Sequence, residues 1–105
     1  MSWVLILVGG AFETVWALAL KRSDGLTQLG PSVIFLVAMV LSMIFLALGL
    51  KSISVGAGYA VWTGTGAVGT ALAAMILFGE STSVSRILPI GLIAAGIVWL
   101  ALAEG

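Results

Sequence analysis

The chain has 105 residues, of which 62% are hydrophobic and only 8% are charged, and its four basic and four acidic residues cancel. A water-soluble domain carries about 25% charged residues, and a small one cannot bury this much apolar surface. The composition therefore excludes a soluble domain. The zero net charge argues against a nucleic-acid partner. The lack of cysteine and histidine excludes disulfides, the usual zinc sites and histidine-activated nucleophiles.

Four apolar segments are each long enough to cross a bilayer, which takes about 20 residues per helix. We expect these spans at residues 3–20, 31–50, 55–78 and 85–103, joined by short polar loops. Strands of a transmembrane barrel alternate polar and apolar residues over about 10 positions, whereas these segments are longer and uniformly apolar. The sequence therefore predicts an all-α integral membrane protein, a four-transmembrane-helix bundle that forms one domain over residues 1–105.

The first span contains Glu13, the only charged residue away from the loops and helix ends. Inserting a charged residue at the middle of a membrane helix costs about 2.5–3.5 kcal/mol, and such residues usually face a cavity that handles ions or protons. The alternative is an acid that serves packing only and is kept neutral by a hydrogen bond. Burial disfavours the charged form of a carboxyl group, so such a group can hold a proton and exchange it for a cation. One site with two mutually exclusive ligands is the minimal antiporter.

Gly10 and Trp16 share the helical face of Glu13, three positions before and after it. Gly10 is small enough to admit a neighbouring helix or a ligand. The Trp16 indole offers a hydrogen-bond donor and a π face for a cation, although a lipid-facing or interfacial role is the alternative. Its position one turn from Glu13 favours a role in the site.

The second span has one hydroxyl group near its middle, that of Ser42, with Met39 one turn earlier. Ser42 can donate a hydrogen bond to a carboxylate, but a serine in a membrane helix often bonds back to its own helix. The sequence leaves both possibilities open, and we treat both residues as candidates for the site.

The third span aligns Tyr59, Trp62, Thr63 and Gly66 along one helical face. Tyr59 and Trp62 supply polar tips on aromatic bodies. Gly64 and Gly66 lie in the middle of the span, where glycine permits both bending and close helix contact. A hinge for alternating access and tight packing alone are therefore both open interpretations.

The fourth span has no polar side chain between Arg86 and Glu104 and is rich in small residues. Small residues favour helix association in membranes, so we expect a dimerisation arm outside the site. Four helices can hardly enclose a water-filled path alone. A second copy inserted in the opposite direction would supply the inverted symmetry that larger transporters use around a midplane site.

The segments Gly10–Ala17 and Tyr59–Gly64 resemble the guanidinium-exporter subtype of the small multidrug resistance family, and the four short spans extend the resemblance over the whole chain. The multidrug branch of that family typically lacks Trp16 and has alanine where Thr63 stands. The resemblance implies an antiparallel dimer in the bacterial inner membrane that exchanges protons for guanidinium ion or small guanidinyl cations, with no cofactor.

The resemblance also implies roles for individual residues. It assigns proton and substrate binding to Glu13, places Ser42, Tyr59 and Trp62 in the surrounding hydrogen-bond network, and puts Trp16 in the same pocket. Because a guanidinium ion is planar with several donors, it matches a carboxylate in a fork geometry. The chemistry expected from the residues and the role implied by the resemblance therefore meet on Glu13.

The basic residues are unevenly distributed between the two sides of the predicted membrane domain. Lys21, Arg22 and Arg86 flank the first and third loops, whereas the second loop holds Lys51 alone, and Ala101 stands where the subtype typically has a lysine. The positive-inside rule then favours an orientation with both termini outside. We expect an antiparallel homodimer with dual topology, and the charge bias raises the alternative that the chain is one half of a heterodimer with a related family subunit.

Two rival functions stand beside the guanidinium exporter. One is the same machine with a broader range, exporting hydrophobic quaternary ammonium cations, against which Trp16 and Thr63 argue. The other is an accessory membrane subunit without transport. Glu13 argues against the accessory role, because such a helix bundle has no need of an acid at the midplane.

Overall fold

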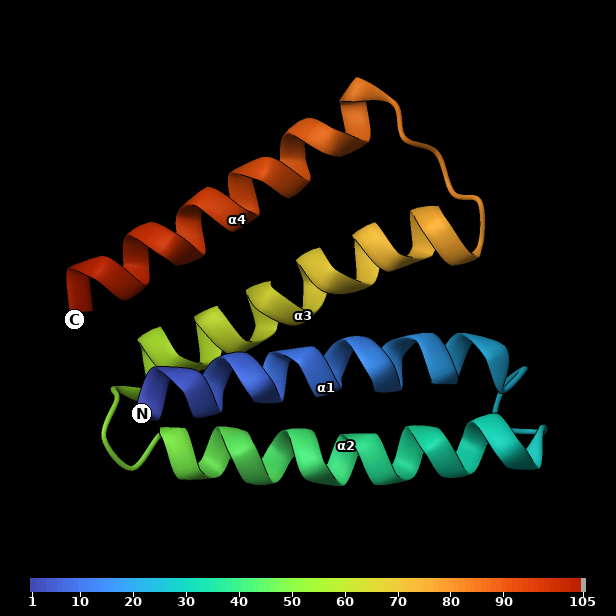
Figure 1. The fold of residues 1–105 in the computed structure, drawn as a ribbon, viewed down its shortest axis with the longest axis horizontal. Helices are drawn as coiled ribbons and strands as arrows, with labels where there is room; N and C mark the ends of the chain where they lie inside the picture. Colours follow the sequence, from blue (N-terminus) through green and yellow to red (C-terminus); the bar gives the residue numbers. More distant parts are fainter. Residues whose placement is uncertain (105) are drawn as a thin grey trace.

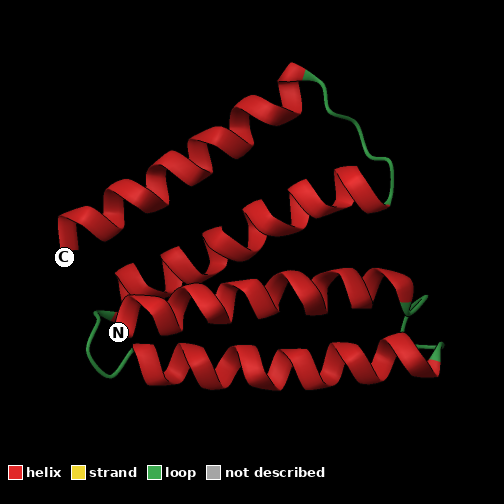
Figure 2. Ribbon diagram, in the orientation of Figure 1, coloured by secondary structure: helices red, strands yellow, loops and turns green. Residues whose placement is uncertain are grey.

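The computed structural model describes residues 1–104, which form four helices. These are α1 (Ser2–Arg22), α2 (Leu29–Gly49), α3 (Val55–Leu77) and α4 (Val84–Glu104). Each is long and apolar enough to cross a membrane, and the described part of the chain contains no strand (Figure 2). The predicted all-α, four-helix membrane architecture is therefore confirmed.

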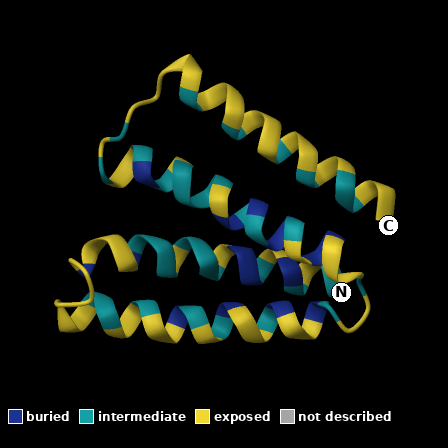
Figure 3. Cartoon of the chain, turned by 180° about the vertical axis from the view of Figure 1, so that it is seen from behind, coloured by how far each residue is buried: buried dark blue, intermediate teal, exposed yellow. Residues whose placement is uncertain are grey.

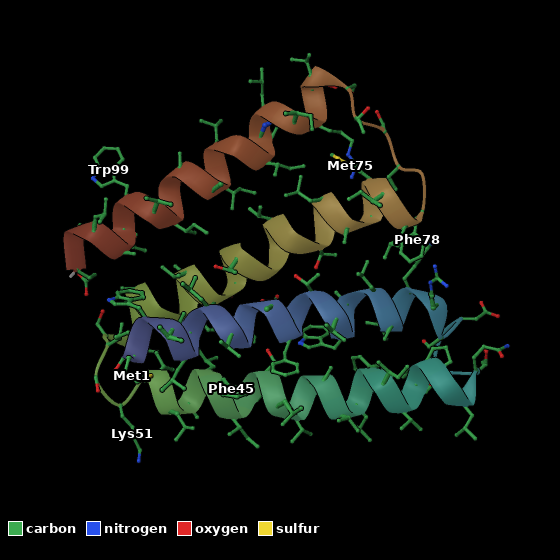
Figure 4. The ribbon with its side chains drawn as sticks, in the orientation of Figure 1. Met1, Phe45, Lys51, Met75, Phe78 and Trp99 are labelled. Carbon is green, nitrogen blue, oxygen red and sulfur yellow. The ribbon has the colours of Figure 1, made fainter. Side chains whose placement is uncertain are left out.

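The helices alternate in direction, so both chain termini lie at the same end of the molecule (Figure 1). We call this the terminal end, which also carries the α2–α3 connection, residues 50–54. The opposite end carries the two other connections, residues 23–28 and 78–83, and we call it the loop end. Figure 4 shows Lys51 at the terminal end and Phe78 at the loop end.

The first helix extends slightly beyond its predicted span. The predicted span ends at residue 20, whereas α1 continues through Lys21 and Arg22, which lie in its last turn. Cations are favourable there because the carbonyl groups of the last turn carry the negative end of the helix dipole. At the start of α2, Pro31 lies in the first turn, where its missing N–H has no helical partner to lose.

The third helix links the α1–α2 pair to α4. Helix α1 packs against α2 and α3, while α4 contacts only α3 among the described helices. None of the described residues of α4 is buried, and Figure 3 shows this helix as exposed or intermediate along its length. Trp99 points away from the other helices (Figure 4) and is 77% exposed. Most of the surface of α4 is thus free to meet lipid or another protein chain.

The hydrophobic core lies toward the terminal end. Its centre is formed by residues from α1, α2 and α3, namely Ile6, Leu46, Val61 and Trp62. Two glycines allow the close approach there, because a Cβ at Gly49 would overlap Ile6 and one at Gly58 would overlap Leu50. Small residues bring membrane helices into close contact, and here they draw the helices together between the terminal end and the level of Glu13.

Candidate functional site

Glu13 lies in the middle of α1 and faces α3. A Cβ added at Gly66 of α3 would overlap the Glu13 carboxyl group, so the glycine provides the space that this side chain occupies. The Oε1 atom of Glu13 is shielded from solvent and has no hydrogen-bond partner among the described residues. A buried polar atom without a partner is costly. The alternative interpretation of Glu13, an acid that serves packing only, requires a hydrogen bond that keeps the carboxyl group neutral. The Oε1 atom makes no such bond among the described residues.

Thr14, next to Glu13, closes the contact between α1 and α3. Its hydroxyl donates a hydrogen bond to the Gly66 carbonyl oxygen at 3.3 Å, and a Cβ at Gly69 would overlap the same hydroxyl. The contact therefore ties the backbone of α3 to α1 beside the carboxyl group. Sequence reasoning missed Thr14 and Gly69, although their positions next to Glu13 and one turn after Gly66 were the available signal.

A chain of two hydrogen bonds joins three helices one turn from Glu13. The Trp62 indole N–H of α3 donates to the Ser42 hydroxyl of α2 at 3.1 Å, and that hydroxyl donates to the Gly9 carbonyl oxygen of α1 at 2.6 Å. Ser42 is fully buried. Regular helical bonding pairs the Gly9 carbonyl with the backbone amide of Glu13. The chain thus ends on the helical turn that carries the carboxyl group.

The structure matches neither of the two possibilities left open for Ser42. The hydroxyl bonds neither to its own helix nor to the Glu13 carboxylate, since its proton is directed to the backbone of α1. Its oxygen accepts the Trp62 donor at the same time. The structure therefore brings Ser42 and Trp62 together, and their hydrogen bonds link α2 and α3 to the backbone of α1.

The two other aromatic candidates lie on opposite sides of this hydrogen-bond chain. Trp16 contacts Phe35 of α2 edge-on, with 5.8 Å between the ring centroids, and its Nε1 is buried without an acceptor. Tyr59 lies against Trp62 with 5.5 Å between the ring centroids and is 53% exposed. Helix α1 thus carries an unpartnered indole donor, Trp16 Nε1, one turn beyond an unpartnered carboxyl oxygen, Glu13 Oε1.

Gly10 and Gly64 make helix contacts on different sides of the bundle. A Cβ at Gly10 would stand 2.8 Å from the Thr65 side chain, so this glycine admits α3. A Cβ at Gly64 would overlap Ile97 of α4, whereas Gly66 faces Glu13. The two glycines predicted as a possible hinge therefore contact different helices, and each has a packing role.

The remaining two candidates make no polar contact among the described residues. Thr63 is partly buried, and its hydroxyl oxygen is shielded from solvent without a hydrogen-bond partner. Met39 is partly buried on α2. No group of three or more acidic, histidine or cysteine residues in the described part of the chain could hold a metal ion. The site is thus built from one carboxyl group, indoles, hydroxyls and glycines.

Comparison with known proteins identifies relatives over the whole length of the chain. Residues 1–93 match the family described as Small Multidrug Resistance protein. The chain is 52% identical over 104 residues to the Guanidinium exporter of Yersinia pseudotuberculosis serotype I (strain IP32953), covering 99% of this chain and 100% of that protein. It is 49% identical over 102 residues to the Guanidinium exporter of Salmonella typhimurium (strain LT2) and 48% identical over 102 residues to that of Citrobacter freundii, with 97% of each chain covered.

Proposed function

Because this chain belongs to the small multidrug resistance family, we propose that it is a proton-coupled antiporter that exports guanidinium ion or small guanidinyl cations. Its four membrane-spanning helices and its family make it a multi-pass protein of the bacterial inner membrane. The family and the relatives named above are exporters. Their shared name supports guanidinium as the substrate, and the chemistry of the site supports it independently.

The observation that carries the proposal is the unpartnered Glu13 carboxyl oxygen in the middle of α1. A carboxylate binds a guanidinium ion through charge-assisted hydrogen bonds in a fork geometry. The nearby Trp16 ring offers a π face to the same cation. Glu13 would thus bind the charge and the donors, while Trp16 favours a flat cation.

Coupling follows if the proton and the cation use the same carboxyl oxygens. A protonated Glu13 has lost the charge that attracts guanidinium, and a bound guanidinium occupies the atoms that would take the proton. The two ligands then exclude each other, so export of one cation is linked to entry of protons. The hydrogen bonds of Ser42 and Trp62 would hold the α1 backbone in place while Glu13 changes its ligand.

We propose further that the working form is an antiparallel dimer. Helix α4 has no buried residue in the described part of the chain. Gly91 and Gly96 on this helix have open space where a Cβ would be, which permits close approach of another helix. The excess of basic residues at the loop end favours one orientation, so a related family subunit inserted in the opposite direction is the second candidate partner.

The test is proton movement driven by a guanidinium gradient in liposomes that contain the purified protein. We expect wild type to respond to guanidinium far more strongly than to a quaternary ammonium cation, and Glu13→Gln to abolish the response. Glu80→Gln is the matched control, because it makes the same chemical change at the α3–α4 connection, where the carboxylate only pairs with Arg86. No response to either cation, with wild type and Glu13→Gln indistinguishable, would leave only the accessory role.

A further inference from the structure

An open cavity with two basic residues in its wall lies at the loop end of the molecule, where the ends of α1 and α3 meet the start of α2. It has a volume of about 560 Å³ and is lined by Lys21, Arg22, Gln28, Pro31 and Phe78. Lys21 is eight positions beyond Glu13, which is about 12 Å along a helix that rises 1.5 Å per residue. None of the residues proposed for transport lines this cavity.

The cavity carries positive charge that no carboxylate neutralises. The only ion pair in the described part of the chain joins Arg86 to Glu80 at 2.8 Å, which leaves Lys21 and Arg22 without an acidic partner. Asp24 lies close by in the chain but does not line the cavity. An anion is therefore the ligand that this charge distribution favours.

Arg22 is held in place by an aromatic contact. Its guanidinium carbon lies 5.1 Å from the centroid of the Phe78 ring, within the range of a cation–π interaction. Phe78 reaches from the end of α3 toward the end of α1 (Figure 4). The contact leaves the N–H groups at the edge of the guanidinium plane free to donate to phosphate oxygens.

The surroundings of the cavity are apolar on the side that faces lipid. Pro31 and Phe78 form part of its wall. Nearby, Leu26 in the α1–α2 connection is 55% exposed and Leu29 at the start of α2 is 80% exposed. Apolar side chains exposed this strongly beside two free cations fit the boundary between hydrocarbon and headgroups. A ligand that combines an anionic head with an apolar tail would contact both kinds of surface.

We propose that this cavity binds the headgroup of an anionic phospholipid. Lys21 and Arg22 contact the phosphate, the Gln28 amide donates to a headgroup oxygen, and the acyl chains lie against the exposed leucines. Juxtamembrane basic residues gain about 1 kcal/mol each near an anionic membrane surface. A bound lipid would bridge the end of α1 and the start of α2 beside the end of α3, away from the transport site.

The test is lipid binding to the purified protein in detergent, measured by native mass spectrometry. Phosphatidylglycerol and phosphatidylcholine with identical acyl chains are compared, and we expect the first to bind more tightly. Arg22→Gln and Lys21→Gln should each weaken phosphatidylglycerol binding about fivefold. Lys51→Gln is the matched control, because it removes one cation at the terminal end, and it should leave binding unchanged.

Two further measurements keep the proposal open to refutation if a charge variant fails to fold. Phe78→Leu keeps every charge but removes the ring beneath Arg22, and it should also weaken phosphatidylglycerol binding. Glycerophosphoglycerol, which has the same headgroup without acyl chains, and inorganic phosphate should compete only weakly. Equal binding of both lipids, equal losses in Lys51→Gln and Arg22→Gln, or full competition by inorganic phosphate would overturn the assignment to a lipid.

Discussion

The hydrogen-bond chain through Ser42 makes a prediction that can be worked out from the contacts. Ser42→Ala removes both hydrogen bonds that join α1, α2 and α3 next to the turn of Glu13. The Gly9 carbonyl keeps its helical bond from the Glu13 amide. The Trp62 indole N–H, in a residue that is only 4% exposed, loses its acceptor. The substitution therefore leaves one buried donor without a partner.

The expected loss of stability is about 2 kcal/mol. Hydrogen bonds between membrane helices contribute on average about 0.6 kcal/mol each, so two of them contribute about 1.2 kcal/mol. A buried donor left without an acceptor costs about 1–3 kcal/mol, and this cost overlaps with the loss of its own bond. We therefore expect Ser42→Ala to lower the free energy of unfolding by roughly the sum of the two bonds and a modest further penalty for the indole.

Reversible unfolding in mixed micelles, followed by helix content, measures this loss. Ser32→Ala is the matched control, because the Ser32 hydroxyl also makes a 2.6 Å hydrogen bond, but to the Gln28 carbonyl at the exposed start of α2. We expect that control to change the free energy of unfolding by less than about 0.5 kcal/mol. Equal losses in the two variants would refute the assigned role of Ser42.

A double-mutant cycle with Trp62→Phe separates the hydrogen bond from the rest of the packing. Phenylalanine keeps an aromatic ring and removes the indole donor, so combining it with Ser42→Ala leaves no unpartnered N–H at this position. The two losses should therefore sum to more than the loss in the double variant, with a coupling of about 0.6–1.7 kcal/mol. Strictly additive losses would show that the two side chains do not interact.

Three further predictions concern the transport site and the orientation of the chain. Gly66→Ala places a methyl group against the Glu13 carboxyl and should abolish guanidinium-driven proton movement in liposomes. Gly56→Ala, at a position with open space around it, should preserve this proton movement. Equal activity of the two variants would contradict the contact between Gly66 and Glu13. Guanidinium binding, followed by tryptophan fluorescence in detergent, should weaken as the pH falls because protons compete for Glu13, and pH-independent binding would contradict shared occupancy. A reporter fused to the C-terminus should respond mainly from outside the membrane, since three of the four basic side chains lie at the loop end, and equal response from both sides would contradict a fixed orientation.

The fold was predictable because the membrane leaves few choices. Each span must be about 20 apolar residues long and must satisfy its own backbone hydrogen bonds, so hydropathy and length nearly define the helices. The same physics singled out Glu13, since a carboxyl group far from both membrane surfaces is costly. Spacing along α3 also placed Tyr59 beside Trp62, which the structure shows in contact.

The partners of individual side chains were not predictable in the same way. Helical spacing says which residues share a face, but it does not say which helix covers that face. Gly64 and Gly66 looked equivalent in the sequence, yet positions two apart point about 160° away from each other on a helix with 3.6 residues per turn. One therefore meets Ile97 of α4 and the other meets Glu13 of α1. Ser42 posed the same problem, and only the packing of α1 against α2 identified the Gly9 carbonyl as its acceptor.

Packing along the bundle is uneven in a way that bears on transport. The buried residues of α1–α3 lie mostly between the terminal end and the level of Glu13 and Gly66, and beyond that level toward the loop end the helices bury only Ala19 and Ala74. Glu13 thus sits where a tightly packed half meets a looser half. A subunit inserted in the opposite direction, whether a second copy or a related family member, would set the looser half of one chain beside the tight half of the other. If each chain then loosened its tight half and tightened its looser half, the same carboxyl group would face first one side of the membrane and then the other. This exchange would need no internal repeat within the chain.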